Sequence, residues 1–296
     1  MPFIKKVERG RRTYYYLEHS LREGKRVYKK RVYLGVSVPS NITVMKSELV
    51  EGLYEKRWYV NFSKIKKSYG RTLAKTPVIV RRRNLEAFMV RFTYDTQRIE
   101  GSKLSFPDTA KLLIDRKTPK DAAINDVKEA ELHKEVFYEI LSQKEDLSLE
   151  GVLQWHKKLF ADTKMEVAGK IRDYPVLINR TDFLPPRPER LDDLLEDFFS
   201  WYNRAKDEIN PVKLAALVHL KFVSIHPFGD GNGRISRLMM NFVLHRMDYP
   251  MMDIKYVDRF GYYRALKRSG LEGGEHVFIE WFFKKYEEAN KDYFSY

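Results

Sequence analysis

The chain has 296 residues, of which 43% are hydrophobic, enough for one large domain or two smaller ones with a sizeable core. It contains no cysteine, which excludes disulfides and any site that needs a thiol. No apolar run reaches membrane-spanning length, and the first residues lack the apolar core of a signal peptide, so we expect a cytoplasmic protein with no membrane partner.

Most of the net positive charge lies in the first forty residues. The formal net charge is +14, and residues 1–40 contain eleven Lys or Arg against three Glu. The same stretch holds five tyrosines and three β-rich segments that predict a small meander, near residues 3–8, 13–21 and 26–34. Interleaved basic and aromatic residues can bind nucleic acid, but the pattern also fits a solvated face or a dock for an acidic partner.

The rest of the chain is predicted to be mainly α-helical. Residues 36–40 have the composition of a linker, and residues 41–83 are expected to form a basic helical connection to a core over residues 84–296. Apolar spacing predicts helices in the core near residues 85–100, 105–115, 119–143, 147–161, 188–206, 210–225, 231–247, 259–269 and 276–293.

The first core helix is predicted to end at Gly101, since glycine is the usual residue just past a helix C-terminus. Glu100 then lies in the last turn, where its negative charge opposes the helix dipole. A cationic partner would stabilise this carboxylate, although composition alone favours an exposed glutamate with no particular partner.

Residues 168–180 are short, β-rich and interrupted by Asp173 and Pro175. This pattern predicts a hairpin or an extended segment, with an apolar run at Val176, Leu177 and Ile178. Periodicity alone also fits an ordinary hairpin that covers the core.

The segment His226-Pro-Phe-Gly-Asp-Gly-Asn-Gly-Arg-Ile-Ser-Arg237 lies between two strongly apolar helical segments. Its three glycines permit close backbone approach to a ligand, and the N-terminus of the second helix favours an anion. Arg234 and Arg237 can reach the same helix end, where guanidinium groups suit phosphate oxygens. Asp230 fits such a site if Mg²⁺ lies between it and the phosphates, and His226 can accept a proton at neutral pH.

This segment resembles the signature of the Fic family, His-x-Phe-x-(Asp/Glu)-Gly-Asn-Gly-Arg-x-x-Arg, at every fixed position. Most members of that family transfer AMP from ATP to a protein hydroxyl. The resemblance covers about residues 84–290 and implies a helical core with a β-hairpin flap, here preceded by the small β-meander module.

The resemblance also implies roles for individual residues. His226 would be the general base, Phe228 would anchor the loop, and Asp230 would hold Mg²⁺ between the α- and β-phosphates. The remaining phosphate contacts would come from Gly231, Asn232, Gly233, Arg234 and Arg237. A phosphotransferase branch of the family carries Lys in place of Gly233 and lacks the final Arg, so Gly233 and Arg237 favour AMP transfer.

A second resemblance lies upstream, at Thr96-Gln-Arg-Ile-Glu100-Gly101, which is similar to the inhibitory motif of autoregulated Fic proteins. In that subclass the Glu pairs with the second Arg of the signature, here Arg237. Glu100 would then keep Arg237 from the γ-phosphate of ATP and act as an internal brake.

The segment at 171–178 resembles the flap that presents a target protein by strand addition, and the resemblance places Val176, Leu177 and Ile178 at the nucleotide site. Tyr262 and Tyr263 match an aromatic pair near the nucleoside in relatives, and they fit core aromatics equally well.

The predicted function is therefore a Mg²⁺-dependent protein adenylyltransferase that uses ATP and is autoinhibited through Glu100. Two alternatives stay open: AMP removal by the same site, and a nucleic-acid-associated regulator with a nucleotide-sensing core. The intact His226 argues against the second alternative, because a sensor needs no base. The sequence leaves open whether the chain forms a homodimer.

Overall fold

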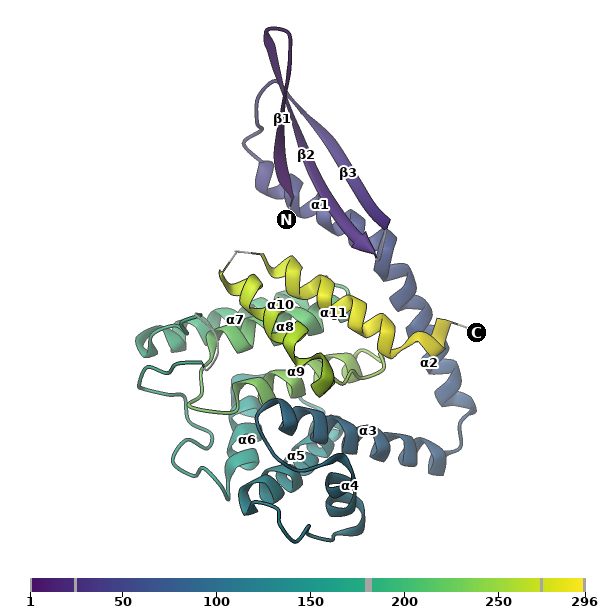
Figure 1. Ribbon diagram of the computed structural model, residues 1–296, viewed down its shortest axis with the longest axis vertical. Coiled ribbons are helices and arrows are strands. Elements are labelled where there is room, and N and C mark those ends of the chain that lie inside the picture. The colour runs from purple at the N-terminus through teal and green to yellow at the C-terminus, as the bar shows by residue number, and fades with distance from the viewer. Residues whose placement is uncertain (1, 24–25, 179–182, 272–273, 295–296) are drawn as a thin grey trace. The chain divides into compact units, whose positions relative to one another are not determined.

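The computed structural model describes residues 2–23, 26–178, 183–271 and 274–294 and divides into two compact units, residues 1–64 and 65–296 (Figure 1). The boundary falls inside the segment 41–83 that the sequence predicts as a helical connection. None of the described helices is long and apolar enough to cross a membrane.

The first unit begins with the predicted meander, an antiparallel sheet in the order β1-β2-β3. Its strands are β1 (Phe3–Arg9), β2 (Arg12–Glu23) and β3 (Arg26–Gly35). Helix α1 (Ile42–Tyr54) contacts β2. Leu17 of the sheet and Leu49 of α1 are buried, so the helix covers one face of the sheet and gives the module a small apolar core.

A π-helical turn, Glu55–Tyr59, joins α1 to α2 (Val60–Lys75), which runs across the boundary between the units. The second unit then contains α3 (Val78–Ile99), α4 (Phe106–Asp115), α5 (Ile124–Ser142), α6 (Leu149–Phe160), α7 (Leu191–Ala205), α8 (Pro211–Ile225), α9 (Asn232–Arg246), α10 (Arg259–Leu271) and α11 (Glu275–Ala289), with short 3-10 turns at Pro188–Arg190, Tyr256–Asp258 and Lys291–Phe294. Each predicted core helix forms, and α3 begins earlier than predicted, directly after Pro77.

Helices α8 and α9 form the centre of the second unit. Helix α8 is apolar almost all round, whereas α9 carries polar side chains among its apolar ones, and both helices are buried along nearly their whole length. Helices α7 and α11 pack against α8, whereas α3, α5 and α6 pack against α9 (Figure 1). The loop between α8 and α9 is thereby held between two rigid, buried elements.

The predicted β-hairpin at 168–180 is wrong for the described part of that segment: residues 168–178 form turns, bends and irregular backbone but no strand. Residues 179 and 180 lie outside the described residues. The side chain of Arg172 donates hydrogen bonds to the carbonyls of Tyr174, Pro186 and His226, and its backbone N–H donates to the carbonyl of Pro227. Two groups that a hairpin ladder could pair, the N–H of Arg172 and the carbonyl of Tyr174, are thus bonded elsewhere, and proline at 175 has no N–H to donate.

Candidate active site

The loop between α8 and α9 is closed by backbone conformation and by one asparagine. His226 ends α8 in the left-handed region, with φ of 54°, and Gly231 precedes α9 with φ of 82°. The amide of Asn232 accepts a hydrogen bond from the N–H of Phe228 at 2.9 Å and donates one to its carbonyl at 2.8 Å. The side chain of Asn232 is therefore used to hold the loop, and its backbone N–H lies in the free first turn of α9.

His226 is held as a neutral imidazole. Its Nδ1 lies 3.1 Å from the carbonyl oxygen of Val223, which can only accept, so we assign the proton to Nδ1 and leave Nε2 as the basic nitrogen. Burial lowers the pKa of His226, and the nearby charge of Arg172 lowers it further. The side chain can therefore take a proton at neutral pH without first having to lose one.

Phe228 anchors the loop in the core, as expected. Its ring is fully buried and stacks on His156 with ring centroids 3.7 Å apart. His156 also accepts a hydrogen bond from the N–H of Gly169 on Nδ1, so its Nε2 donates to the carbonyl of Asp230 at 2.9 Å. Burial lowers the pKa of His156 to about 4, which keeps this bridge neutral.

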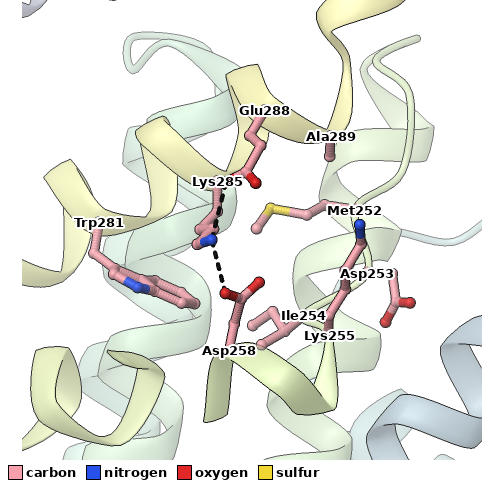
Figure 2. Close-up of a pocket in the computed structure, with 9 residues that line it drawn as sticks. All are labelled: Met252, Asp253, Ile254, Lys255, Asp258, Trp281, Lys285, Glu288 and Ala289. Carbon is pink, nitrogen blue, oxygen red and sulfur yellow. Dashed lines mark hydrogen bonds and ion pairs between the residues drawn. The ribbon is translucent and has the colours of Figure 1, made fainter. Parts of the chain in front are cut away.

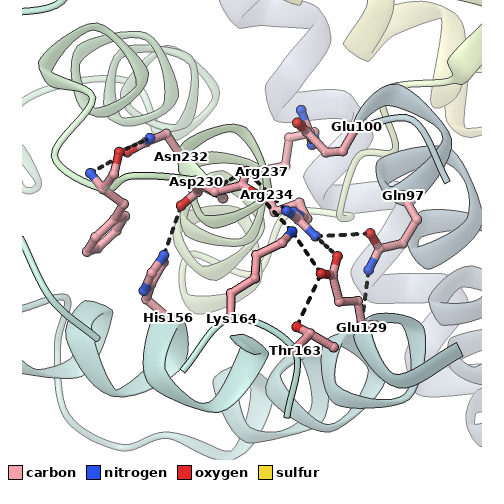
Figure 3. Close-up of polar contacts among 12 residues, drawn as sticks. Gln97, Glu100, Glu129, His156, Thr163, Lys164, Asp230, Asn232, Arg234 and Arg237 are labelled. Atoms are coloured by element: carbon pink, nitrogen blue, oxygen red, sulfur yellow. Dashed lines mark hydrogen bonds and ion pairs between the residues drawn. The ribbon is translucent and has the colours of Figure 1, made fainter. Parts of the chain in front are cut away.

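Arg234 lies in a buried network of acids and amides (Figure 3). It forms an ion pair with Glu129 of α5, reaches Asp230 Oδ1 at 3.3 Å and donates to Gln97 Oε1 at 3.3 Å. Lys164 bridges the two acids, 2.9 Å from Glu129 and 2.7 Å from Asp230. Burial alone would raise the pKa of Asp230, but Arg234 and Lys164 outweigh it and lower the pKa, so the carboxyl is charged.

Arg237 is 1% exposed and has a separate set of partners, all from α3 and α10. Its Nε donates to the hydroxyl of Thr96 at 2.9 Å, one terminal nitrogen donates to Tyr262 at 3.3 Å, and the other pairs with the carboxylate of Glu100. Burial opposes the charge of Arg237, but Glu100 and Tyr262 outweigh it and raise the pKa of the guanidinium. The predicted Glu100–Arg237 pair is therefore present.

The carboxylate of Glu100 also lies at the N-terminus of α9. A Cβ at position 233 would lie 2.5 Å from Oε1 of Glu100, so a larger residue there would force the carboxylate to move from its present position. Gly101 follows with φ of 107°, which ends α3 and turns the chain away. Glu100 thus occupies the position where the free N–H groups of α9 would attract a phosphate.

The other predicted residues lie differently. Tyr262 is fully buried beneath Arg237, and its hydroxyl lies 3.0 Å from Nε2 of His219, so it acts as a core partner of the arginine. Tyr263 is 40% exposed and donates to the carbonyl of Ile99 at the end of α3.

In the segment after Arg172, Leu177 is 83% exposed and its neighbours Val176 and Ile178 are partly exposed. Their outward placement fits contact with a ligand or partner better than a role in the core.

Sequence reasoning missed four residues of the network: Gln97, Glu129, His156 and Lys164. Gln97 lies inside the upstream motif at residues 96–101, so the motif indicates the segment but not this residue. Glu129 and His156 are polar residues on otherwise apolar helix faces, which is a weak signal, and nothing marks Lys164 within its loop.

A small pocket elsewhere in the second unit has a volume of about 20 Å³, room for roughly one water, so it is no nucleotide site (Figure 2). Its rim carries the ion pair between Lys285 and Asp258, 2.8 Å apart. Asp253, at the edge of this pocket, is buried against Asp95 of α3. Burial and the hydrogen bond with Asp95 raise the pKa of Asp253 well above its ordinary value, so the two carboxyls share a proton.

Asp230 is the candidate metal ligand. Among the described residues, no group of three or more His, Asp or Glu side chains is placed to hold a metal ion. A carboxylate that is charged, partly exposed and at the mouth of a helix N-terminus suits Mg²⁺, which takes one or two carboxylates and completes its shell with phosphate and water oxygens.

Comparison with known proteins places this loop in a family. Residues 146–244 match the model of the Fic/DOC family. The protein adenylyltransferase Fic of Drosophila melanogaster is 32% identical over 204 residues, which are 68% of this chain and 41% of that protein. The one from Nematostella vectensis is 30% identical over 181 residues, 60% of this chain and 42% of the relative. The chain thus spans about two fifths of the curated relatives it matches.

Solved structures agree in fold. A Fic domain-containing signaling protein from Bacteroides thetaiotaomicron superposes with a TM-score of 0.71 at 26% identity, covering 77% of this chain and 94% of the other. Fic-1 of C. elegans gives a TM-score of 0.70 at 25% identity over 87% and 77% of the two chains. With its signature loop, its helical core and these relatives, the chain carries a Fic domain and belongs to the Fic/DOC family.

Proposed function

We propose that the chain transfers AMP from ATP to a hydroxyl group of a target protein. The observation that carries the proposal is the loop at 226–237, in which a neutral His226 stands before a helix N-terminus flanked by Asp230, Arg234 and Arg237. The names of the relatives, protein adenylyltransferases, support the same activity.

In the proposed reaction, Nε2 of His226 takes the proton of the target hydroxyl while its oxygen attacks the α-phosphorus. The bond from that phosphorus to the bridging oxygen of the β-phosphate breaks, and pyrophosphate leaves with the electron pair. The N–H groups at the start of α9 and the guanidinium of Arg237 would bind the phosphates and fix this direction. Asp230 would hold Mg²⁺, which would supply positive charge to the phosphate oxygens.

Arg234 has a supporting role in this proposal. Its guanidinium is 2% exposed and is held by Glu129 and Gln97. Arg234 would therefore position Asp230 and the first turn of α9 rather than bind the nucleotide directly. Arg237, by contrast, can exchange one partner, Glu100, for a phosphate without losing Thr96 and Tyr262.

This exchange makes Glu100 a brake. While its carboxylate lies over Gly233 and pairs with Arg237, the γ-phosphate of ATP could neither pair with Arg237 nor occupy the space beside Gly233. ATP would then bind in a way that does not present the α-phosphate to His226. The target would approach along residues 171–178, which are exposed or partly exposed apart from Arg172 and form no strand pairing within the described part of the chain.

The reaction is tested with ATP labelled at the α- or the γ-phosphate, in the presence of Mg²⁺. We expect label on protein from the α-position only, more in Glu100→Gly than in the wild type, and a loss of at least about 100-fold in the same variant carrying His226→Ala. His245→Ala, a histidine in the last turn of α9, is the matched control and should keep the label. Label from the γ-position would reject AMP transfer, and unchanged labelling in Glu100→Gly would reject the brake.

A further inference from the structure

The sheet of the first unit has one covered and one open face. Along β2, Leu17 and His19 point to the covered face and are buried, and Lys30 of β3, paired with His19, reaches Gly52 of α1. The residues that alternate with them point the other way. Cross-strand pairing puts aromatic and basic side chains together on that open face: Phe3, Lys5, Tyr14, Tyr16, Arg31 and Tyr33.

The rings of the open face form a continuous platform. The ring centroid of Tyr33 lies 5.2 Å from that of Tyr16 and 6.3 Å from that of Tyr14. The guanidinium of Arg31 lies over the ring of Tyr16, 3.7 Å from its centroid. Tyr33 of β3 is 54% exposed and Phe3 of β1 is 49% exposed, so both edge strands of the sheet offer planar groups to solvent. Exposing large aromatic rings to water costs free energy that a bound partner would recover. The exposed rings therefore indicate a ligand with flat apolar faces.

The charge around the platform is positive. Its one acid, Glu18, is already paired with Lys29 at 2.6 Å and Arg31 at 3.0 Å, two cations for one carboxylate. The neighbouring β1–β2 turn adds exposed Arg9, Arg11 and Arg12. A ligand for this face therefore combines flat rings with repeated negative charge.

We propose that the open face binds single-stranded nucleic acid. Bases would stack on Tyr33 and on the planes of Tyr16 and Arg31, and the basic side chains around them would bind the phosphates. A base-paired duplex hides the faces of its bases, and an acidic peptide needs charge but no rings, so both fit the exposed platform less well. This inference does not depend on the reaction proposed for the Fic loop.

The test uses the full chain and a dye-labelled oligothymidylate of about 12 nucleotides, a typical site size, with binding followed by fluorescence anisotropy. Tyr33→Ala removes a stacking ring and should weaken binding by at least about fivefold, the equivalent of about 1 kcal/mol per stacked base. Tyr33→Leu keeps apolar bulk and strand propensity and should lose as much, whereas Tyr33→Phe keeps the ring and should bind within about twofold of wild type.

Tyr28→Ala is the matched control. Tyr28 lies on the same strand and is 43% exposed, but the register places it on the opposite face, so its removal should leave affinity unchanged. Circular dichroism of each variant separates loss of binding from loss of the sheet.

Three results would overturn the proposal. The first is no binding at low salt, and the second is equal affinity for a duplex of the same length. The third is binding that Tyr33→Leu leaves unchanged and that polyglutamate displaces as well as the oligonucleotide does, which would make the face a dock for an acidic partner.

Discussion

The Fic loop and the open face of the sheet both concentrate basic side chains, which are buried in the loop and exposed on the sheet. Arg234 and Arg237 are almost fully buried, and each has a fixed set of partners. Arg31 and Lys29 have side chains 42% and 49% exposed and share a single acid. The stability of the fold depends on the partners of the buried arginines, whereas the exposed cations of the sheet are available to a ligand.

Because of this difference, we expect ligand binding at the two sites to be controlled in different ways. In the proposed reaction, Arg237 would bind a phosphate only after releasing Glu100, so activity would depend on a competition inside the protein. On the open face no such exchange is needed, so binding there should depend on the salt concentration of the surroundings.

The largest effect that tests this comparison is the removal of Glu129. Glu129→Ala leaves the buried guanidinium of Arg234 without its main carboxylate and should lower the free energy of unfolding by about 3 kcal/mol. Glu131→Ala, an exposed glutamate two residues on in the same helix, should stay within about 0.5 kcal/mol of wild type. Urea unfolding measures both, and a Glu129→Ala protein as stable as the control would mean that the network does not depend on this pair.

A smaller effect, dependent on pH, is expected at the carboxyl pair that joins α3 to the core. Because the pKa of Asp253 is raised in the folded state, its contribution to stability is present at low pH and is lost as the pH rises through the folded pKa. Asp253→Asn keeps a hydrogen-bond donor toward Asp95 without the second charge.

The variant should gain about 1 kcal/mol or more over wild type near pH 9 and little below about pH 4, the unfolded pKa of an aspartate. The exposed Asp121→Asn should show no such dependence in the same urea titrations. A constant difference between Asp253→Asn and wild type at all pH values would show that the shared proton does not contribute.

The smallest effect on stability is expected on the open face. Lys5→Ala should change the free energy of unfolding by less than about 0.5 kcal/mol. It should also reduce the slope of log affinity for the oligonucleotide against log salt by about 0.7, the value for one phosphate contact on a single strand. Lys6→Ala, on the opposite face of β1, should leave the slope alone, and equal slopes for the two variants would remove the distinction between the faces.

The parts of the structure that could be predicted from sequence are those whose signal is local. The loop at 226–237 is contiguous, so its glycines, acid and arginines predict a phosphate site directly, and the glycine at 101 predicts the end of α3, which the structure confirms. The pairing of Glu100 with Arg237 spans 137 positions and came from resemblance to the family, since nothing local requires it.

The parts that could not be predicted depend on tertiary contacts. Glu129 and Lys164 join the loop through two other elements, and no periodicity marks them as partners of Arg234. The hairpin was predicted from β propensity, but the guanidinium of Arg172 bonds the carbonyl of Tyr174, and the backbone N–H of Arg172 bonds the carbonyl of Pro227. The strands of the meander were predicted, but their register was not, because it shifts at Tyr15 and Tyr16 where β2 meets β3.

The central claim is that Glu100 and the γ-phosphate compete for Arg237. The most direct measurement is the affinity of the full chain for ATP and for ADP, which lacks the γ-phosphate, in wild type, Glu100→Gly and Glu100→Gln. If the claim holds, ATP and ADP bind similarly to wild type. Each substitution should then raise the affinity for ATP over ADP by about tenfold, as expected for one new hydrogen bond to a charged group. An ATP-to-ADP affinity ratio that is the same in all three proteins would contradict the account.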